Sequence, residues 1–180
     1  MKLSVSLAMV CSFAVPAFSQ SAGNPLSAGA KMVYTITKTN VLKSAEEMPE
    51  ENYSFKPVST VRSFGELIGH VADAQYEFCG PVSGDGAKSP EIEKTKTSKA
   101  DLIQGLKDAF AYCDKAYDGM TDAHAADTVN FFGRKAAKLT LLDFNSAHND
   151  EHYGNIVTYL RIKGLVPPSS QREPAAAKKQ

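Results

Sequence analysis

We predict that this chain folds as an all-α protein, a bundle of four long helices. Apolar residues recur every three or four positions in four segments, which is the spacing of a helix that buries one face. No segment keeps the two-residue alternation of a half-buried strand. Three of the four segments also open with Ser or Thr followed three residues later by an acidic residue, the pattern of a capping box.

The first two helices have well-defined start signals. The first is predicted to open at Asn24-Pro25, a capping residue followed by a proline suited to the first helical position, and to end at Met48-Pro49. The second begins at the capping box of Ser63 and Glu66, in which each side chain satisfies an otherwise unpaired backbone donor. Residues 50–60, between these helices, are predicted to form a non-helical connector.

The third helix follows a long connection. Residues 80–97 are rich in Gly, Pro, Ser and Lys and show no apolar period, so we expect an exposed segment without regular structure. The third helix is predicted to begin at the capping box of Ser98 and Asp101 and to end near Gly119.

The last helix follows residues 121–138, to which we assign no regular element. It is predicted to begin at the capping box of Thr140 and Asp143. We expect it to run to about Lys163, where Gly164 and the prolines that follow stop it.

The composition and the N-terminus indicate an exported single domain. The 180 residues hold 20 acidic and 20 basic side chains, so no long-range field attracts nucleic acid or anionic lipid. Residues 1–19 carry a lysine, a short apolar stretch and then small residues at Ala17 and Ser19, as in a secretory signal peptide. We expect a domain over residues 20–168, a disordered tail over 169–180 and a periplasmic or extracellular location, with no membrane attachment after the signal is removed.

Two histidines give the last helix an unusual polar middle. His148 and His152 lie one turn apart on the predicted inward face, so their imidazoles can point at one spot. An unpaired polar group in a core costs about 1 to 3 kcal/mol, and a metal ion is one partner that removes this cost. A solvated helix face or a hydrogen-bonded core remains the alternative for such a pair.

A third ligand must come from another helix, and His70 is the best candidate because it flanks the apolar stripe of the second helix. Asp73 shares the face of His70 and can orient its ring or act as a base; it could equally be a surface charge. Tyr153 is the other weak catalytic candidate. His124 has no spaced partner and is expected at the surface.

Four stretches of the sequence resemble the DinB-like family. They are Met48-Pro-Glu-Glu-Asn-Tyr-Ser-Phe-Lys-Pro57, Ser63-Phe-Gly-Glu-Leu-Ile-Gly-His70, His148-Asn-Asp-Glu-His-Tyr-Gly154 and Tyr159-Leu-Arg-Ile-Lys-Gly-Leu-Val-Pro-Pro168. The resemblance implies a four-helix bundle of up-down-down-up topology. It also implies a divalent metal ion, zinc or nickel in many members, held by three histidines that map onto His70, His148 and His152.

The implied topology bears on the cysteines that remain after the signal peptide. It makes the second and third helices parallel, which would bring Cys79 and Cys113 to nearly equal heights. Such an arrangement is compatible with one disulfide. Two buried free thiols are the alternative.

The resemblance also suggests what the protein does. Some members of the wider superfamily are metal-dependent transferases that use bacillithiol, mycothiol or glutathione, and an exported member departs from this pattern because those thiols are mainly cytosolic. We therefore expect a metal-dependent enzyme of thiol transfer or metal-assisted hydrolysis, acting on an undetermined small molecule. A non-catalytic metal-binding or stress-related protein is the alternative, and a homodimer is the assembly kept open.

Overall fold

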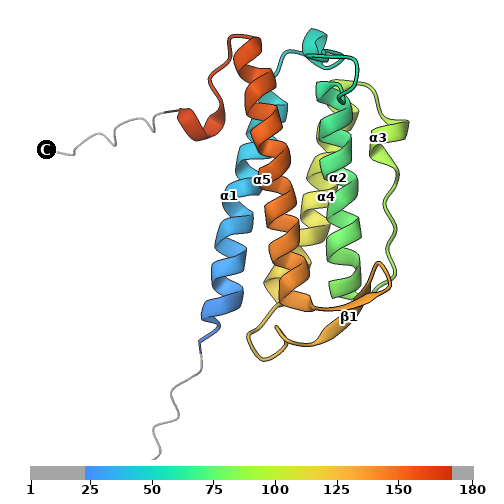
Figure 1. Cartoon of the computed structure of the whole chain (residues 1–180), viewed down its shortest axis with the longest axis vertical. Helices are drawn as coiled ribbons and strands as arrows, with labels where there is room; N and C mark the ends of the chain where they lie inside the picture. The colour runs from blue at the N-terminus through green and yellow to red at the C-terminus, as the bar shows by residue number, and fades with distance from the viewer. Residues whose placement is uncertain (1–22, 172–180) are drawn as a thin grey trace, which may run out of the picture.

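The computed structural model describes residues 23–171, so the predicted signal peptide and most of the predicted tail lie outside the described residues. Four long helices pack around one core (Figure 1). They are α1 (Pro25–Glu47), α2 (Phe64–Ser83), α4 (Lys99–Gly119) and α5 (Lys138–Ile162). In Figure 1, α1 and α5 rise from the lower end, whereas α2 and α4 descend from the upper end. The prediction of a mostly helical fold is confirmed.

The start of α1 is fixed by a residue from a distant loop. The helix begins at Pro25 as predicted, but the Asn24 side chain does not cap it. Instead, the Asp122 carboxylate accepts hydrogen bonds from the backbone N–H groups of Leu26 and Ser27, at 3.1 and 2.8 Å. The Asn24 side chain in turn accepts from the backbone N–H of Asp122 at 2.9 Å. This exchange ties the first turn of α1 to the loop after α4.

The capping box predicted for α2 is present. The Ser63 hydroxyl accepts from the backbone N–H of Glu66 at 3.2 Å, and the Glu66 carboxylate accepts from the backbone N–H of Ser63 at 2.6 Å. The connector before it includes one short 3-10 helix, η1 (Glu50–Asn52). Tyr53 follows η1 and donates from its hydroxyl to the Ala45 carbonyl, so the connector is fastened to the end of α1.

The connection after α2 is shorter and better ordered than the sequence predicted. α2 continues through Pro81 to Ser83 and ends at Gly84, whose φ of 71° suits a left-handed helix cap. A one-turn helix, α3 (Ile92–Thr95), then lies beside α2 (Figure 1). Ile92 is only 2% exposed, so the segment is anchored in the core. A single apolar residue creates no repeating pattern in the sequence, so the burial of Ile92 was not predicted.

A β-hairpin occupies the segment to which no element was assigned. β1 (Thr128–Phe131) pairs antiparallel with β2 (Arg134–Ala137) through a turn at Phe132 and Gly133. The hairpin leads directly into α5, which begins at Lys138 without a side-chain cap. The capping box predicted at Thr140 is therefore wrong, because backbone bonds from Lys138 and Leu139 to the preceding loop already start the helix.

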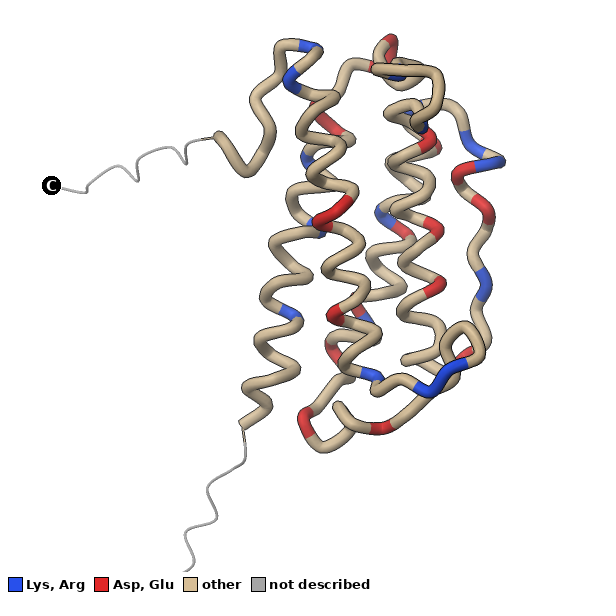
Figure 2. Tube along the Cα trace, viewed as in Figure 1, with Lys and Arg blue, Asp and Glu red and all other residues tan. Residues whose placement is uncertain are grey.

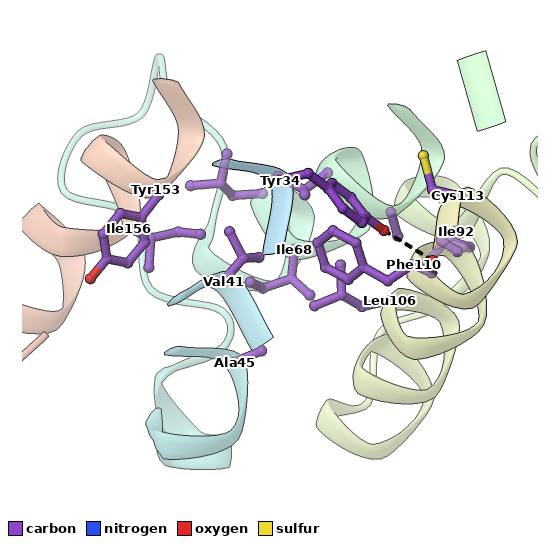
Figure 3. Close-up of a cluster of buried hydrophobic side chains, with 14 of the residues drawn as sticks. Tyr34, Val41, Ala45, Ile68, Ile92, Leu106, Phe110, Cys113, Tyr153 and Ile156 are labelled. Carbon is purple, nitrogen blue, oxygen red and sulfur yellow. Dashed lines mark hydrogen bonds between the residues drawn. The ribbon is translucent and has the colours of Figure 1, made fainter. Parts of the chain in front are cut away.

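Aromatic and aliphatic side chains from all four long helices fill the core (Figure 3). Tyr34 of α1 stacks on Tyr117 of α4 with ring centroids 3.8 Å apart, and its hydroxyl donates to the Phe110 carbonyl at 3.1 Å. Cys79 and Cys113 form a disulfide between α2 and α4, with Cα atoms 5.4 Å apart. Both cysteines are fully buried, and the disulfide removes the alternative of two free thiols.

Basic and acidic residues are both distributed along the helices and loops of the chain (Figure 2). None of the helices between residues 23 and 171 is both long enough and apolar enough to cross a bilayer. A last 3-10 helix, η2 (Pro168–Ser170), packs against α1.

Candidate metal centre

The structure brings His70, His148 and His152 together. His70 comes from the second turn of α2, and the other two come from successive turns of α5. The Nε2 atom of His148 lies 3.2 Å from that of His70 and 3.0 Å from that of His152. One nitrogen from each ring can be chosen so that all three lie within 4.8 Å of one another.

These nitrogens cannot satisfy one another by hydrogen bonds alone. A ring nitrogen carries either one proton or one lone pair, so Nε2 of His148 can make one good hydrogen bond but faces two neighbours. A cation accepts all three lone pairs at once. Zinc–nitrogen bonds of about 2.0–2.1 Å in a tetrahedral arrangement place two ligand nitrogens about 3.3 Å apart, close to the observed spacing. The three residues therefore fit a metal ion.

Burial keeps the two α5 histidines neutral at physiological pH. It lowers the pKa of His148 to about 3, helped by the neighbouring His152 and His70. Burial likewise lowers the pKa of His152 to about 4, with His70 adding to the effect. Neutral imidazole is the form that ligates metals, so both rings are in the binding-competent state without needing to lose a proton.

Glu93 supports the ring of His70 from behind. One oxygen of its carboxylate lies 3.3 Å from Nδ1 of His70. The other accepts a hydrogen bond from Nε of Arg62 at 2.8 Å. A carboxylate behind a ligating histidine fixes the orientation of the ring and raises its basicity. Glu93 was not predicted from the sequence, because it lies in the connection that was expected to be exposed and irregular.

Three features hold Glu93 in place. The Asp73 carboxylate accepts from the backbone N–H groups of Ile92 and Glu93 at 2.7 and 2.9 Å, and also from the Ser89 hydroxyl. Gly69 provides room for the backbone of Glu93 to approach α2. The third feature is the buried side chain of Ile92, which anchors the start of α3 in the core. A glycine inside a helix next to His70 was the one signal in the sequence that another chain segment packs closely here.

Asp73 and Tyr153 were the two catalytic candidates predicted from the sequence. The polar groups of both side chains are hydrogen-bonded elsewhere and are not free to act at the three histidines. Asp73 shares the face of His70, but its carboxylate is directed at the start of α3, so it positions Glu93 instead of the His70 ring. The Tyr153 hydroxyl donates to Ser169 Oγ at 2.8 Å and accepts from the Ser169 backbone N–H, which fastens η2. His124 is exposed and lies 2.9 Å from Asp127, as expected for a surface residue.

The surroundings of the three histidines differ on the two sides. An open pocket of about 820 Å³ lies on one side, and His152 and Glu93 line it together with Lys56, Arg62 and Tyr159. On the other side the Phe78 ring lies against His148, with centroids 5.4 Å apart. Phe131 and Phe144 pack on Phe78 and extend this apolar wall. A small molecule in this pocket can therefore reach His152.

A family model described as the DinB superfamily matches residues 34–156, a range that includes all three histidines. The chain belongs to the DinB superfamily. A curated member of similar sequence is the uncharacterized protein YjoA of Bacillus subtilis, which is 28% identical over 123 residues, or 67% of this chain and 79% of the relative.

Solved structures of DinB-like proteins share the fold. A DinB-like protein of Bacillus cereus has a TM-score of 0.66 at 19% identity, covering 78% of this chain and 95% of that one. The YjoA structure has a TM-score of 0.65 at 24% identity, covering 81% and 99%. A mycothiol-dependent maleylpyruvate isomerase has a TM-score of 0.60 at 18% identity, covering 83% and 80%.

Proposed function

We propose that this DinB superfamily protein binds one divalent metal ion, zinc or nickel, with His70, His148 and His152. The observation that carries the proposal is the convergence of three imidazole nitrogens that cannot satisfy one another. An all-imidazole site suits zinc and nickel, as it also suits copper and iron, and the family resemblance favours the first two. The pairing of His70 with Glu93 supports the same assignment, because ligating histidines commonly have a carboxylate behind them.

The proposed activity is metal-dependent thiol transfer or metal-assisted hydrolysis. Three protein ligands leave coordination positions open, as in catalytic and not closed structural sites. When bound, such an ion lowers the pKa of a coordinated water or thiol and so supplies a nucleophile. Residues of this chain would hold the site rigid on two helices, exclude water with the Phe78 wall and admit the substrate through the pocket lined by His152. The shared fold with a mycothiol-dependent isomerase supports the thiol-using version.

Metal binding without turnover is the second candidate, and one observation favours it. Asp73 and Tyr153, the two residues that could have served as general base or acid, are engaged in hydrogen bonds that hold α3 and η2. The metal site would then serve storage or stress protection. The two candidates differ in whether the loaded protein turns over thiols with electrophiles.

The proposal also includes export of the protein and the up-down-down-up topology of its helices. The predicted signal peptide would direct the protein to an oxidising compartment, and the disulfide between Cys79 and Cys113 is compatible with such a location. The directions of the four long helices in Figure 1 support the up-down-down-up bundle implied by the family resemblance.

Metal stoichiometry tests the proposed site directly. Elemental analysis of the purified protein is expected to give about one ion per chain, and His148→Ala or His152→Ala should abolish this while circular dichroism still shows the helices. His124→Ala is the matched control, because this exposed histidine lies away from the cluster. Unchanged metal content in the His148 and His152 variants would contradict the site. A screen of the loaded protein with thiols and electrophiles would then separate enzyme from binding protein.

A further inference from the structure

Arg62 places a second positive charge beside the candidate metal centre. Its side chain lines the same pocket as His152, and it shares the Glu93 carboxylate with His70. The Tyr159 hydroxyl donates to the Arg62 carbonyl at 2.6 Å, which fixes its backbone at the start of α2. A guanidinium next to a divalent cation is repelled unless negative charge lies between them. Glu93 supplies only one such charge.

The guanidinium still has donors to offer. Nε of Arg62 is used by Glu93, but its Nη atoms form no hydrogen bond with any residue from 23 to 171. The Arg62 side chain is 43% exposed and lines the pocket. Two Nη groups in one plane match the two oxygens of a carboxylate, and such bidentate pairs are stronger and more directional than single contacts.

The other charges of the pocket narrow the choice of ligand. Lys56 is paired with Glu66 at 2.9 Å, so its charge is already offset. Glu151 also lines the pocket and forms no ion pair within the described part of the chain. This carboxylate opposes a doubly charged phosphate more strongly than a singly charged carboxylate. Thr60, Asn155 and Thr158 add uncharged polar groups to the lining.

We infer that the pocket binds a small molecule through a carboxylate held by Arg62, with the reacting group of that molecule directed at the three histidines. The inference rests on the proposed function, because it needs the metal site as the second point of attachment. The inference adds the substrate class, which is a thiol or electrophile that bears a carboxylate. The metal site alone sets no requirement on the charge of the substrate. Arg62 is then a specificity-determining residue.

Two thiols of the same length test the inference by binding alone. The cobalt(II)-loaded protein is titrated with 6-mercaptohexanoate and with 6-mercapto-1-hexanol, following the thiolate-to-cobalt charge-transfer band in the near ultraviolet. Their chains are too long to favour chelation of one ion by both ends. We expect the carboxylate thiol to bind about tenfold more tightly than the neutral thiol, and Arg62→Gln to remove this preference.

Arg161→Gln is the matched control, because Arg161 is exposed near Ser170 and does not line this pocket. It should keep the tenfold preference. Equal affinity of the wild type for both thiols, or a preference that survives Arg62→Gln, would overturn the inference and leave the metal site standing. Absence of the band with both thiols, with cobalt bound, would overturn the inference and the thiol-transfer activity together, and would leave metal binding without turnover.

Discussion

Gly69 lies against the backbone of Glu93: a Cβ atom on Gly69 would come within 2.6 Å of the Glu93 Cα and 2.9 Å of its N. This contact links α2 to α3 at the residue before His70. Because the obstructing atoms are backbone atoms, they cannot move aside as a flexible side chain could. The absence of a side chain at Gly69 therefore determines where the Glu93 carboxylate sits relative to His70.

Gly69→Ala is expected to push α3 away from α2. Overpacking of this kind costs about 1–3 kcal/mol of unfolding free energy, and it should also weaken metal affinity by displacing Glu93. Urea unfolding and competitive metal titration measure the two effects. Gly154→Ala is the control, because Gly154 lies in α5 with nothing within 4 Å of the added Cβ, and it should be neutral or stabilising. Equal behaviour of the two variants would disprove the role of the contact.

Glu93→Gln should weaken metal binding while leaving the fold intact. The amide keeps the size of the side chain but loses the negative charge behind His70, and loss of such a supporting group costs about 10- to 100-fold in metal affinity. Glu91→Gln on the same segment is the matched control, since within residues 23–171 the Glu91 side chain pairs only with the exposed Lys94. Competition with a chromophoric chelator measures both. An unchanged affinity in Glu93→Gln would show that His70 does not need the carboxylate.

The metal-free protein is expected to lose stability as pH falls below about 6.5. Burial lowers the pKa of His148 to about 3 and that of His152 to about 4 in the folded state, whereas both titrate near 6.5 when unfolded. Between these values the unfolded chain binds more protons, so acid favours unfolding; above 6.5 both states are neutral and the stability is fully present. Urea unfolding from pH 8 to pH 5 measures the effect.

Replacing the buried histidines gives the control for this pH dependence. His148→Gln and His152→Gln remove a titrating group from the cluster and should flatten the curve between pH 6.5 and 5. His124→Gln should leave it unchanged, because His124 is exposed. A curve of the same shape in all four proteins would assign the acid sensitivity to other groups.

Reduction of the disulfide should destabilise the protein by about 3–4 kcal/mol. Cys79 and Cys113 are 34 residues apart. Closing a loop of this length lowers the conformational entropy of the unfolded chain, which stabilises the folded protein by about that amount. Urea unfolding with and without reductant measures the difference, which should vanish in the Cys79→Ala/Cys113→Ala double variant. Alkylation of the unfolded protein before electrophoresis provides a separate check, and two free thiols without reductant would contradict the disulfide.

Much of the fold follows from the sequence alone. The starts of α1, α2 and α4 are marked locally, by Pro25 and by the capping side chains of Ser63 and Ser98, and the structure places these helices accordingly. The spacing of His148 and His152 likewise fixes that both rings share one face of α5, whatever surrounds that helix. These features depend on residues a few positions apart, and such patterns are visible in a sequence.

Other features depend on residues far apart in the chain, and only the tertiary structure decided them. Asp122 caps α1 from 95 residues away, and Asp73 turns from His70 to the start of α3. Glu93 is an acidic residue in a polar connection until Gly69 and the buried Ile92 bring it to His70. The reason is physical: each of these carboxylates is directed by packing between segments, which no local propensity encodes. The sequence determined which three histidines could meet, and tertiary packing determined what orients them and what lies beside them.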